Sequence, residues 1–227
     1  MSGIGTLQEN SLHASLKSWY AQPGDQQEIK VDGYVIDLVR GDLLVEIQTA
    51  NFSAIKRKLG KLLDNHLVRL VYPIAVEKWI LRVSGDGITP LGRRKSPKRG
   101  QVIDLFQELV RIPKLVQHPN FALEVILIRE EVVWREDGRG SWRRKGRSIA
   151  DRRLIEVISR TAFTTPDDLR VLIPGGLPPI FTVRDLAKAS AQPRYKAGKM
   201  AYCLREMGIF EPVGKRGRAL AYRVKPV

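Results

Sequence analysis

A run of three short β-rich segments between Gln26 and Thr49 constrains the fold of this chain more than any other stretch. The dipeptides Asp32-Gly33 and Gly41-Asp42 separate the segments, and such two-residue loops close tight antiparallel hairpins. A two-residue loop also decides which residues lie opposite each other. Counting outwards from Gly41-Asp42 places Asp37 opposite Glu46. The sequence therefore predicts a three-stranded meander in which two acids face each other.

A third carboxylate joins this row, because the loop at Asp32-Gly33 places Glu28 opposite Asp37 from the other side. Directly opposed residues share one face of a sheet, with roughly 5 Å between their Cβ atoms. Like charges in this position destabilise a sheet unless they are paired or bind a metal, and carboxylate oxygens suit Mg²⁺. Two interpretations stay open: a metal site, or a solvent-facing surface with salt bridges to Lys30.

A helix is predicted before the meander, over residues 6–20, with Thr6 as its N-cap. Glu9 lies three residues after the cap and on the same stripe as Leu12 and Leu16, and His13 shares that stripe. Glu9 is therefore a candidate fourth acid aimed at the sheet. The alternative is that Glu9 only completes the capping box of its own helix.

The segments after the meander predict a helix from Asn51 or Ser53 to about Asn65, and then a strand over 66–72 that Pro73 ends. The helix, three antiparallel strands, helix and strand resemble the αβββαβ core of the PD-(D/E)XK nuclease superfamily, an α/β fold with a mixed sheet. The resemblance covers about residues 4–74.

The motif of that superfamily is an Asp followed by Glu-x-Lys, and here Asp37 is followed by Glu46-Ile47-Gln48. The resemblance implies a Mg²⁺- or Mn²⁺-dependent deoxyribonuclease. By the same resemblance Asp37, Glu46 and the backbone carbonyl of Ile47 hold the metal, and Glu9 supplies the helix carboxylate that some members use.

The sequence departs from the motif at Gln48, which stands where the superfamily has its lysine and cannot act as a cation. Some restriction-type members tolerate Gln at this position. Lys30 lies on the polar face of the first strand and is the first candidate to replace the lysine, with Lys56 and Lys58 of the following helix as second choices. An ordinary ion pair with a neighbouring carboxylate is the alternative role for Lys30.

The formal net charge of +15 indicates a polyanionic partner, and DNA is the expected one. Residues 84–100 are glycine-rich and basic, and predict a flexible loop that follows a phosphate backbone or, alternatively, a solvated surface loop. Its expected DNA contacts are Arg93, Arg94, Lys95, Lys98 and Arg99. A second basic segment, residues 138–146, adds Arg143, Arg144 and Lys145.

The middle of the chain predicts an amphipathic helix over 102–110 and a buried strand over 121–128, which residues 132–134 extend or follow. The glycine-flanked basic segment 138–146 is the expected domain boundary. We therefore expect a nuclease-like domain over residues 1–140 and a second domain over 141–227. The second domain is predicted to open with a helix from Ser148 to about Ala162.

The last segment resembles a winged helix-turn-helix. Thr182-x-x-Asp185 predicts a capped helix, a second helix ends at Met207, and two strands follow around residues 214–218. In that family the second helix enters the major groove and the hairpin contacts the DNA backbone or the minor groove. The DNA contacts that this implies are Arg194, Tyr195, Lys196, Lys199, Lys215, Arg216 and Arg218. A protein–protein role is the alternative, since winged helices also serve such contacts.

Two functions follow from the sequence. The first is a metal-dependent DNA endonuclease of repair or recombination, targeted by the winged helix, which Asp37, Glu46 and Glu9 favour. The second is a non-catalytic, regulatory or scaffold DNA-binding protein with a degenerate nuclease core, which Gln48 favours. A homodimer is plausible, because cutting both strands generally needs two active sites. The lone Cys203, and the lack of a secretory signal or long apolar run, lead us to expect a cytoplasmic, nucleoid-associated protein without membrane contact.

Overall fold

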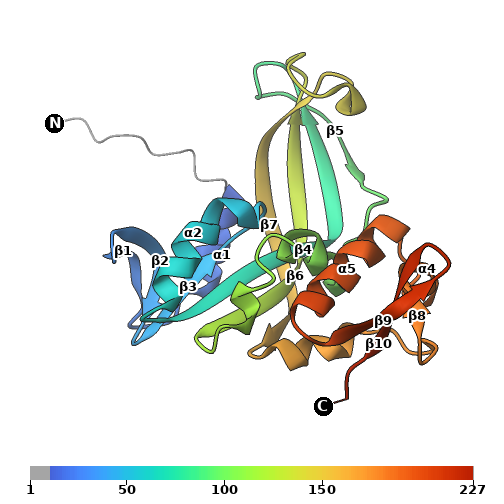
Figure 1. The fold of residues 1–227 in the computed structure, drawn as a ribbon. Helices are drawn as coiled ribbons and strands as arrows, with labels where there is room; N and C mark the ends of the chain where they lie inside the picture. Colours follow the sequence, from blue (N-terminus) through green and yellow to red (C-terminus); the bar gives the residue numbers. More distant parts are fainter. Residues whose placement is uncertain (1–10, 227) are drawn as a thin grey trace.

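The computed structural model describes residues 11–226, which form a mixed α/β fold around a seven-stranded sheet (Figure 1). The strand order is β1-β2-β3-β4-β6-β7, and β5 pairs with β4. The strands of this sheet are β1 (Gln26–Val31), β2 (Tyr34–Arg40), β3 (Leu43–Ile47), β4 (Leu67–Val83), β5 (Pro90–Lys95), β6 (Phe121–Arg135) and β7 (Ser148–Phe163). None of the helices in this described part is long and apolar enough to cross a membrane.

The predicted meander is confirmed, and both hairpins have the predicted register near their loops, although neither Glu28–Asp37 nor Asp37–Glu46 is one of the paired positions. Val39 pairs with Leu44 across the second hairpin, and Val31 pairs with Tyr34 across the first. Asp32 and Gly33 both have positive φ, at 47° and 84°. This is the backbone that a two-residue hairpin loop needs to match the twist of its strands.

Two helices cover opposite faces of the meander. Helix α1 (Ser11–Tyr20) packs on the face that carries Val45, and α2 (Phe52–Leu63) packs on the face that carries Leu44. Helix α2 confirms the predicted helix within two residues at each end. The predicted N-cap Thr6 and the candidate acid Glu9 lie outside the described residues.

Strand β4 is longer than predicted. Pro73 was expected to end it, but β4 continues as one strand to Val83. Strand β3 ends opposite Val71, and β5 pairs with β4 only from Trp79 to Val83. Position 73 therefore has a neighbouring strand on one side, where it aligns with Ile126. A proline without its N–H is tolerated there, because no ladder hydrogen bond is needed on the open side.

The predicted helix over 148–162 is wrong, because these residues form strand β7, antiparallel to β6 along nearly all its length. Apolar residues at Leu154, Ile155 and Ile158 fit a helical period, but the segment is also rich in β-branched residues, and pairing with β6 decides the outcome. The boundary expected between residues 140 and 141 lies in the turn that joins these two paired strands. The expected strands over 121–128 and 132–134 are one strand, β6.

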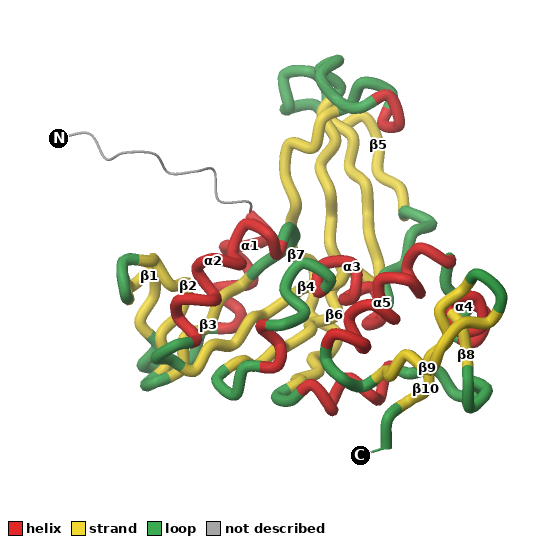
Figure 2. Tube along the Cα trace, in the orientation of Figure 1, coloured by secondary structure: helices red, strands yellow, loops and turns green. Residues whose placement is uncertain are grey.

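The predicted flexible loop over 84–100 is also partly a strand, since β5 pairs antiparallel with the end of β4. The outer parts of β4, β5, β6 and β7 form an arm that projects from the body of the molecule (Figures 1 and 2). Two neighbouring turns lie at the free end of the arm. Residues 84–89 join β4 to β5, and residues 136–147, which include the short 3₁₀ helix η3 (Trp142–Arg144), join β6 to β7. We call residues 136–147 the arm tip.

The C-terminal part has the predicted two helices and hairpin, and it adds a short strand, so that a three-stranded sheet of order β8-β10-β9 forms. The capping boxes at Thr165 and Thr182 are present. The remaining elements are η1 (Val102–Leu105), α3 (Phe106–Leu109), η2 (Leu115–Gln117), η4 (Pro166–Leu172), β8 (Phe181–Thr182), α4 (Val183–Ala189), α5 (Arg194–Glu206), β9 (Phe210–Arg216) and β10 (Ala219–Val224).

One cluster of buried side chains runs from α2 through α3 into α5 and the small C-terminal sheet. Polar contacts add to this docking: Lys196 Nζ on α5 lies 2.5 Å from Asp104 Oδ1, and Gln192 Nε2 donates to Gln101 Oε1 at 2.7 Å. The sheet and the C-terminal elements therefore share a core.

Candidate functional site

The two acids of the second hairpin lie next to each other. The backbone N–H of Ile47 donates to Asp37 Oδ2 at 2.8 Å, and His13 Nε2 on α1 lies 3.2 Å from the same oxygen. The neighbouring Glu46 is only 5% exposed, and Lys58 Nζ on α2 lies 2.5 Å from its Oε1. We call Asp37, Glu46 and Lys58 the acid site.

Burial and charge separate the pKa values of the two acids. Burial, followed by the charge of Asp37, raises the pKa of Glu46 to about 7, although Lys58 opposes this shift. Burial by itself would also raise the pKa of Asp37, but hydrogen bonds from His13 and from the Ile47 backbone hold it below its usual value. Near neutral pH Asp37 is therefore ionised, while Glu46 is present in both its protonated and its ionised form. Paired functional carboxylates take different roles in this way.

The cation at the acid site is Lys58, a second choice of the sequence analysis, and the first choice, Lys30, is not there. Lys30 is exposed on β1, opposite Val35. Besides this ion pair, Lys58 is held in place by a hydrogen bond from its Nζ to the carbonyl of Val35 at 2.5 Å. Because α2 follows β3 directly, its inward face brings this lysine over the strand that carries Glu46.

Two other predicted residues have different surroundings from those expected. The side-chain amide of Gln48 donates to the carbonyl oxygens of Ala50 and Asn51, so it braces the turn into α2. Glu28 has a φ of 55°, and its carboxylate pairs with Lys17 Nζ at 2.5 Å. The expected row of three acids is thus a pair within residues 11–226.

His13 is a site residue to which sequence reasoning gave no role. Its position on the apolar stripe of α1 was visible in the sequence, and this stripe does face the sheet. The sequence could not show that His13 contacts Asp37, because this contact depends on how α1 lies across the meander.

The carboxylates of Asp37 and Glu46 are oxygen donors of the kind that hard divalent cations use. Within the described residues no group of three or more His, Cys, Asp or Glu side chains is placed to hold a metal ion. Mg²⁺, however, is usually held by one or two carboxylates with water and substrate phosphate as its other ligands. Glu46 Oε1 is buried, and the positive charge next to it is Lys58 Nζ at 2.5 Å, so a metal ion bound here would share or displace this contact.

A basic groove of about 990 Å³ runs along one face of the arm. It begins at Thr49 and Ala50, directly after Gln48, and ends at the arm tip. Of the predicted DNA contacts, it is lined by Arg94, Lys98, Arg143 and Arg144. We call it the arm groove.

The other predicted contacts of the arm lie outside this groove. Lys145 and Arg93 line an adjoining hollow of the tip, and Arg93 also pairs with Glu131 at 2.7 Å. Lys95 pairs with Glu77 at 2.6 Å, and Arg99 is exposed beyond the end of β5.

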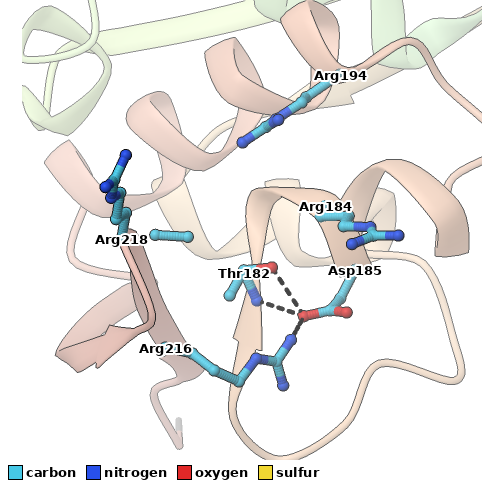
Figure 3. A pocket seen from close by; sticks show the side chains of 7 residues that line it. Thr182, Arg184, Asp185, Arg194, Arg216 and Arg218 are labelled. Carbon is cyan, nitrogen blue, oxygen red and sulfur yellow. Dashed lines mark hydrogen bonds and ion pairs between the residues drawn. The ribbon is translucent and has the colours of Figure 1, made fainter.

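A second basic pocket lies between α4, α5 and the β9–β10 hairpin (Figure 3). Its carboxylate, Asp185, accepts hydrogen bonds from Thr182 and pairs with Arg216. No carboxylate pairs with its other arginines among the described residues. Four arginines line this pocket: Arg184, Arg194, Arg216 and Arg218.

The sequence analysis anticipated three of these arginines and missed Arg184, in the first turn of α4. Conversely, Lys196 and Lys199, expected at a DNA groove, contact Asp104 Oδ1 at 2.5 Å and the carbonyl of Gln107 at 3.3 Å. That face of α5 is docked on η1 and α3. Tyr195 is 61% exposed, and Lys215 is exposed on the hairpin.

Comparisons with known proteins identify relatives without an assigned activity. A family model described as "Domain of unknown function (DUF8091)" matches residues 10–164. A protein of Treponema pallidum (strain Nichols), described as uncharacterized, is 34% identical over 230 residues, which cover 98% of this chain and 88% of that protein. No solved structure matches the chain. The family match includes the whole seven-stranded sheet and passes through the boundary expected at residue 140.

Proposed function

The chain belongs to the DUF8091 family of domains of unknown function, and we propose that it is a metal-dependent DNA endonuclease. The acid site is the observation that carries this proposal. Two neighbouring carboxylates and one lysine resemble the acids and the lysine of the PD-(D/E)XK motif, and Mg²⁺ or Mn²⁺ bound there would assist hydrolysis of a phosphodiester.

Each residue of the acid site has a distinct role in this proposal. Asp37, Glu46 and the carbonyl oxygen of Ile47 would hold the metal ion, which supplies Lewis acidity at the phosphoryl group when it is bound. His13 positions the Asp37 carboxylate through its hydrogen bond. Gln48 stands where the motif has its lysine, and Lys58 takes over the role of that lysine, as a cation next to the charge that develops on the phosphate.

The basic surfaces support DNA as the partner. A net charge of +15, the arm groove and the four-arginine pocket all favour a polyanion. The order β8-α4-α5-β9-β10 resembles that of a winged helix, which supports the inference that its hairpin and Arg194 contact the DNA backbone. Because α5 docks on η1 and α3, the proposal assigns Lys196 and Lys199 to this docking. Such an enzyme would act in the cytoplasm at the nucleoid, and a homodimer would supply the two sites needed to cut both strands.

The second candidate is a non-catalytic DNA-binding protein. It is favoured by Gln48, whose amide serves the turn into α2, and by the absence of a third acid at the site within residues 11–226. The basic surfaces would then be the functional part of the molecule.

Cleavage of supercoiled, linear and branched DNA with Mg²⁺ or Mn²⁺ separates the two candidates. We expect Asp37→Asn, Glu46→Gln and Lys58→Met each to lower the cleavage rate by about 100-fold or more, the scale of losing a charge contact in the transition state. Two matched controls should retain the rate: Asp42→Asn in the same hairpin and Lys56→Met on the same helix, both exposed. If the wild-type protein binds these DNAs and cleaves none of them, the enzyme proposal is wrong and the second candidate stands.

A further inference from the structure

The arm tip presents an aromatic side chain to solvent. Trp142 in η3 is 82% exposed, and the guanidinium of Arg143 lies 5.4 Å from its ring centroid. A single exposed ring is common on protein surfaces, so its meaning depends on the groove that lies next to it.

The arm groove below Trp142 alternates apolar and cationic side chains. Ile80 and Val132 form its apolar floor, and Trp134 lies under Arg94, whose guanidinium is 5.8 Å from the indole centroid. No carboxylate lines the groove in the described chain. Its cations are Lys78, Arg94, Lys98, Arg143, Arg144 and Arg152.

The cations of the groove are only partly neutralised. Glu130, which is fully buried, pairs with Lys78 Nζ at 2.6 Å and with Arg152 Nη2 at 2.6 Å. Arg94, Arg143 and Arg144 have no carboxylate partner in the part of the chain described. They leave a positive surface next to the exposed Trp142 and the half-buried Trp134, where phosphate groups would be attracted.

The arm tip is built to a defined shape. The backbone N–H of Gly140 donates to the carbonyl of Gly146 at 2.8 Å, and a Cβ at position 140 would lie 1.6 Å from the carbonyl oxygen of Arg147. Only glycine fits there, and Ser148 Oγ closes the turn on Asp137 Oδ2 at 2.7 Å. The tip therefore holds Trp142 on a structured turn.

We propose that the arm groove binds an unpaired DNA strand, with bases stacked on Trp142 and Trp134 and phosphates on the neighbouring arginines. Aromatic rings interleaved with cations are the surface that single strands use, because each unpaired base offers a flat face. A duplex hides its base faces and would leave the exposed indole and the apolar floor without a partner.

The inference rests on the proposed nuclease function and gives it a substrate class. Because the groove begins at Thr49 and Ala50, directly after Gln48, a strand that fills it leads towards the strand that carries Glu46. The substrate is then DNA with a single-stranded segment, such as a tail, gap or branch.

Fluorescence anisotropy tests the inference with a labelled mixed-sequence DNA of about 20 nucleotides, as a single strand and as a duplex. The measurement is made with EDTA and at fixed ionic strength, so that neither cleavage nor salt affects it. We expect the duplex affinity to be the same in the wild type and in Trp142→Ala, because duplex binding in the proposed function uses the C-terminal hairpin and Arg194 instead of the arm groove. Trp142→Ala should weaken single-strand binding by about 5- to 100-fold, the range for loss of one stacked base, and Trp142→Phe should recover part of it. The matched control is Trp19→Ala on α1, which removes an indole that is 45% exposed away from the groove.

Unchanged single-strand affinity in Trp142→Ala, or an equal loss of duplex affinity in this variant, would overturn this inference and leave the proposed endonuclease in place. Absence of binding to either DNA would overturn both, because the nuclease proposal itself needs a DNA partner. A similar loss of affinity in Trp19→Ala would also overturn the inference, since the effect would not then be specific to the groove.

Discussion

Glu46 is buried next to another carboxylate, and its pKa of about 7 makes the stability of the protein depend on pH. In the unfolded chain a glutamate has a pKa of about 4.3. Between these two values the folded protein keeps a proton that the unfolded chain has lost. The contribution of Glu46 is therefore fully present below about pH 4.3 and is lost as pH rises through about 7.

We expect the free energy of unfolding to fall by up to roughly 3 kcal/mol between about pH 5 and 8 because of this group, since each pKa unit corresponds to about 1.4 kcal/mol. Urea unfolding of the wild type and of Glu46→Gln across this range measures it. As pH rises, the free energy of unfolding of the wild type should fall relative to that of Glu46→Gln. A pH-independent difference would show that the carboxyl is ionised in the folded state throughout.

Lys58 and His13 show why a residue's role at the acid site depends on more than its place in a motif. Each reaches an acid from a different helix, and each helix packs on a different face of the sheet. A buried carboxylate needs a cation, but any cation that the fold brings near can satisfy it. The lysine position of a strand motif can therefore be vacant while the charge is supplied from α2.

At the scale of elements, β4 and β7 are held by their neighbours more than by their own sequences. Strand β4 passes through Pro73, and β7 forms where an apolar period favours a helix, because both pair along β6. The hairpins and α2, by contrast, follow their local signals. Substitution of glycines tests this difference between local and tertiary control, because some glycines lie in a helix with free space around them and others lie against the backbone of another element.

Gly60 and Gly100 make a matched pair of alanine substitutions. Gly60 is inside α2, with nothing within 4 Å of an added methyl group, so Gly60→Ala should stabilise the protein by about 0.5–1 kcal/mol through helix propensity. At Gly100 a Cβ would lie 2.7 Å from the carbonyl oxygen of Ala75 in β4, so Gly100→Ala should destabilise it by about 1–3 kcal/mol. Urea unfolding measures both, and a change of the same sign in the two variants would contradict this account.

At the scale of the whole molecule, the shared core decides how the chain responds to cleavage. The buried cluster joins α2 and α3 to α5 and the small sheet. Strands β6 and β7, which the arm tip connects, are paired with each other along their length. A break in the tip removes one turn but none of this pairing. The tip is basic and offers trypsin several sites between residues 139 and 147.

We therefore expect limited trypsin digestion at the tip to give two fragments that stay together on size-exclusion chromatography. Unfolding of the uncut chain should occur in one transition, with coincident curves from tryptophan fluorescence and far-UV circular dichroism. Release of a folded fragment starting near residue 148 would contradict the shared core and would support independent domains. A digest of protein unfolded in urea provides the control for fragments that do not associate.

The sequence alone determined the features that depend on residues close together in the chain. The two-residue loops define the register that sets Asp37 beside Glu46, and Thr182 with Asp185 caps its helix as expected. The fold class, a mixed α/β sheet with helices, also follows from these local patterns. Such features are predictable because the hydrogen bonds that make them join residues only a few positions apart.

Only the tertiary structure decided the features that join distant segments. It made residues 148–163 a strand, turned Lys196 towards Asp104, and brought Lys58 to Glu46 in place of Lys30. The arm groove likewise combines side chains of four strands and a turn that no single segment reveals. The physical reason is that strand pairing and burial depend on which surfaces meet, and a local pattern that fits two structures cannot choose between them.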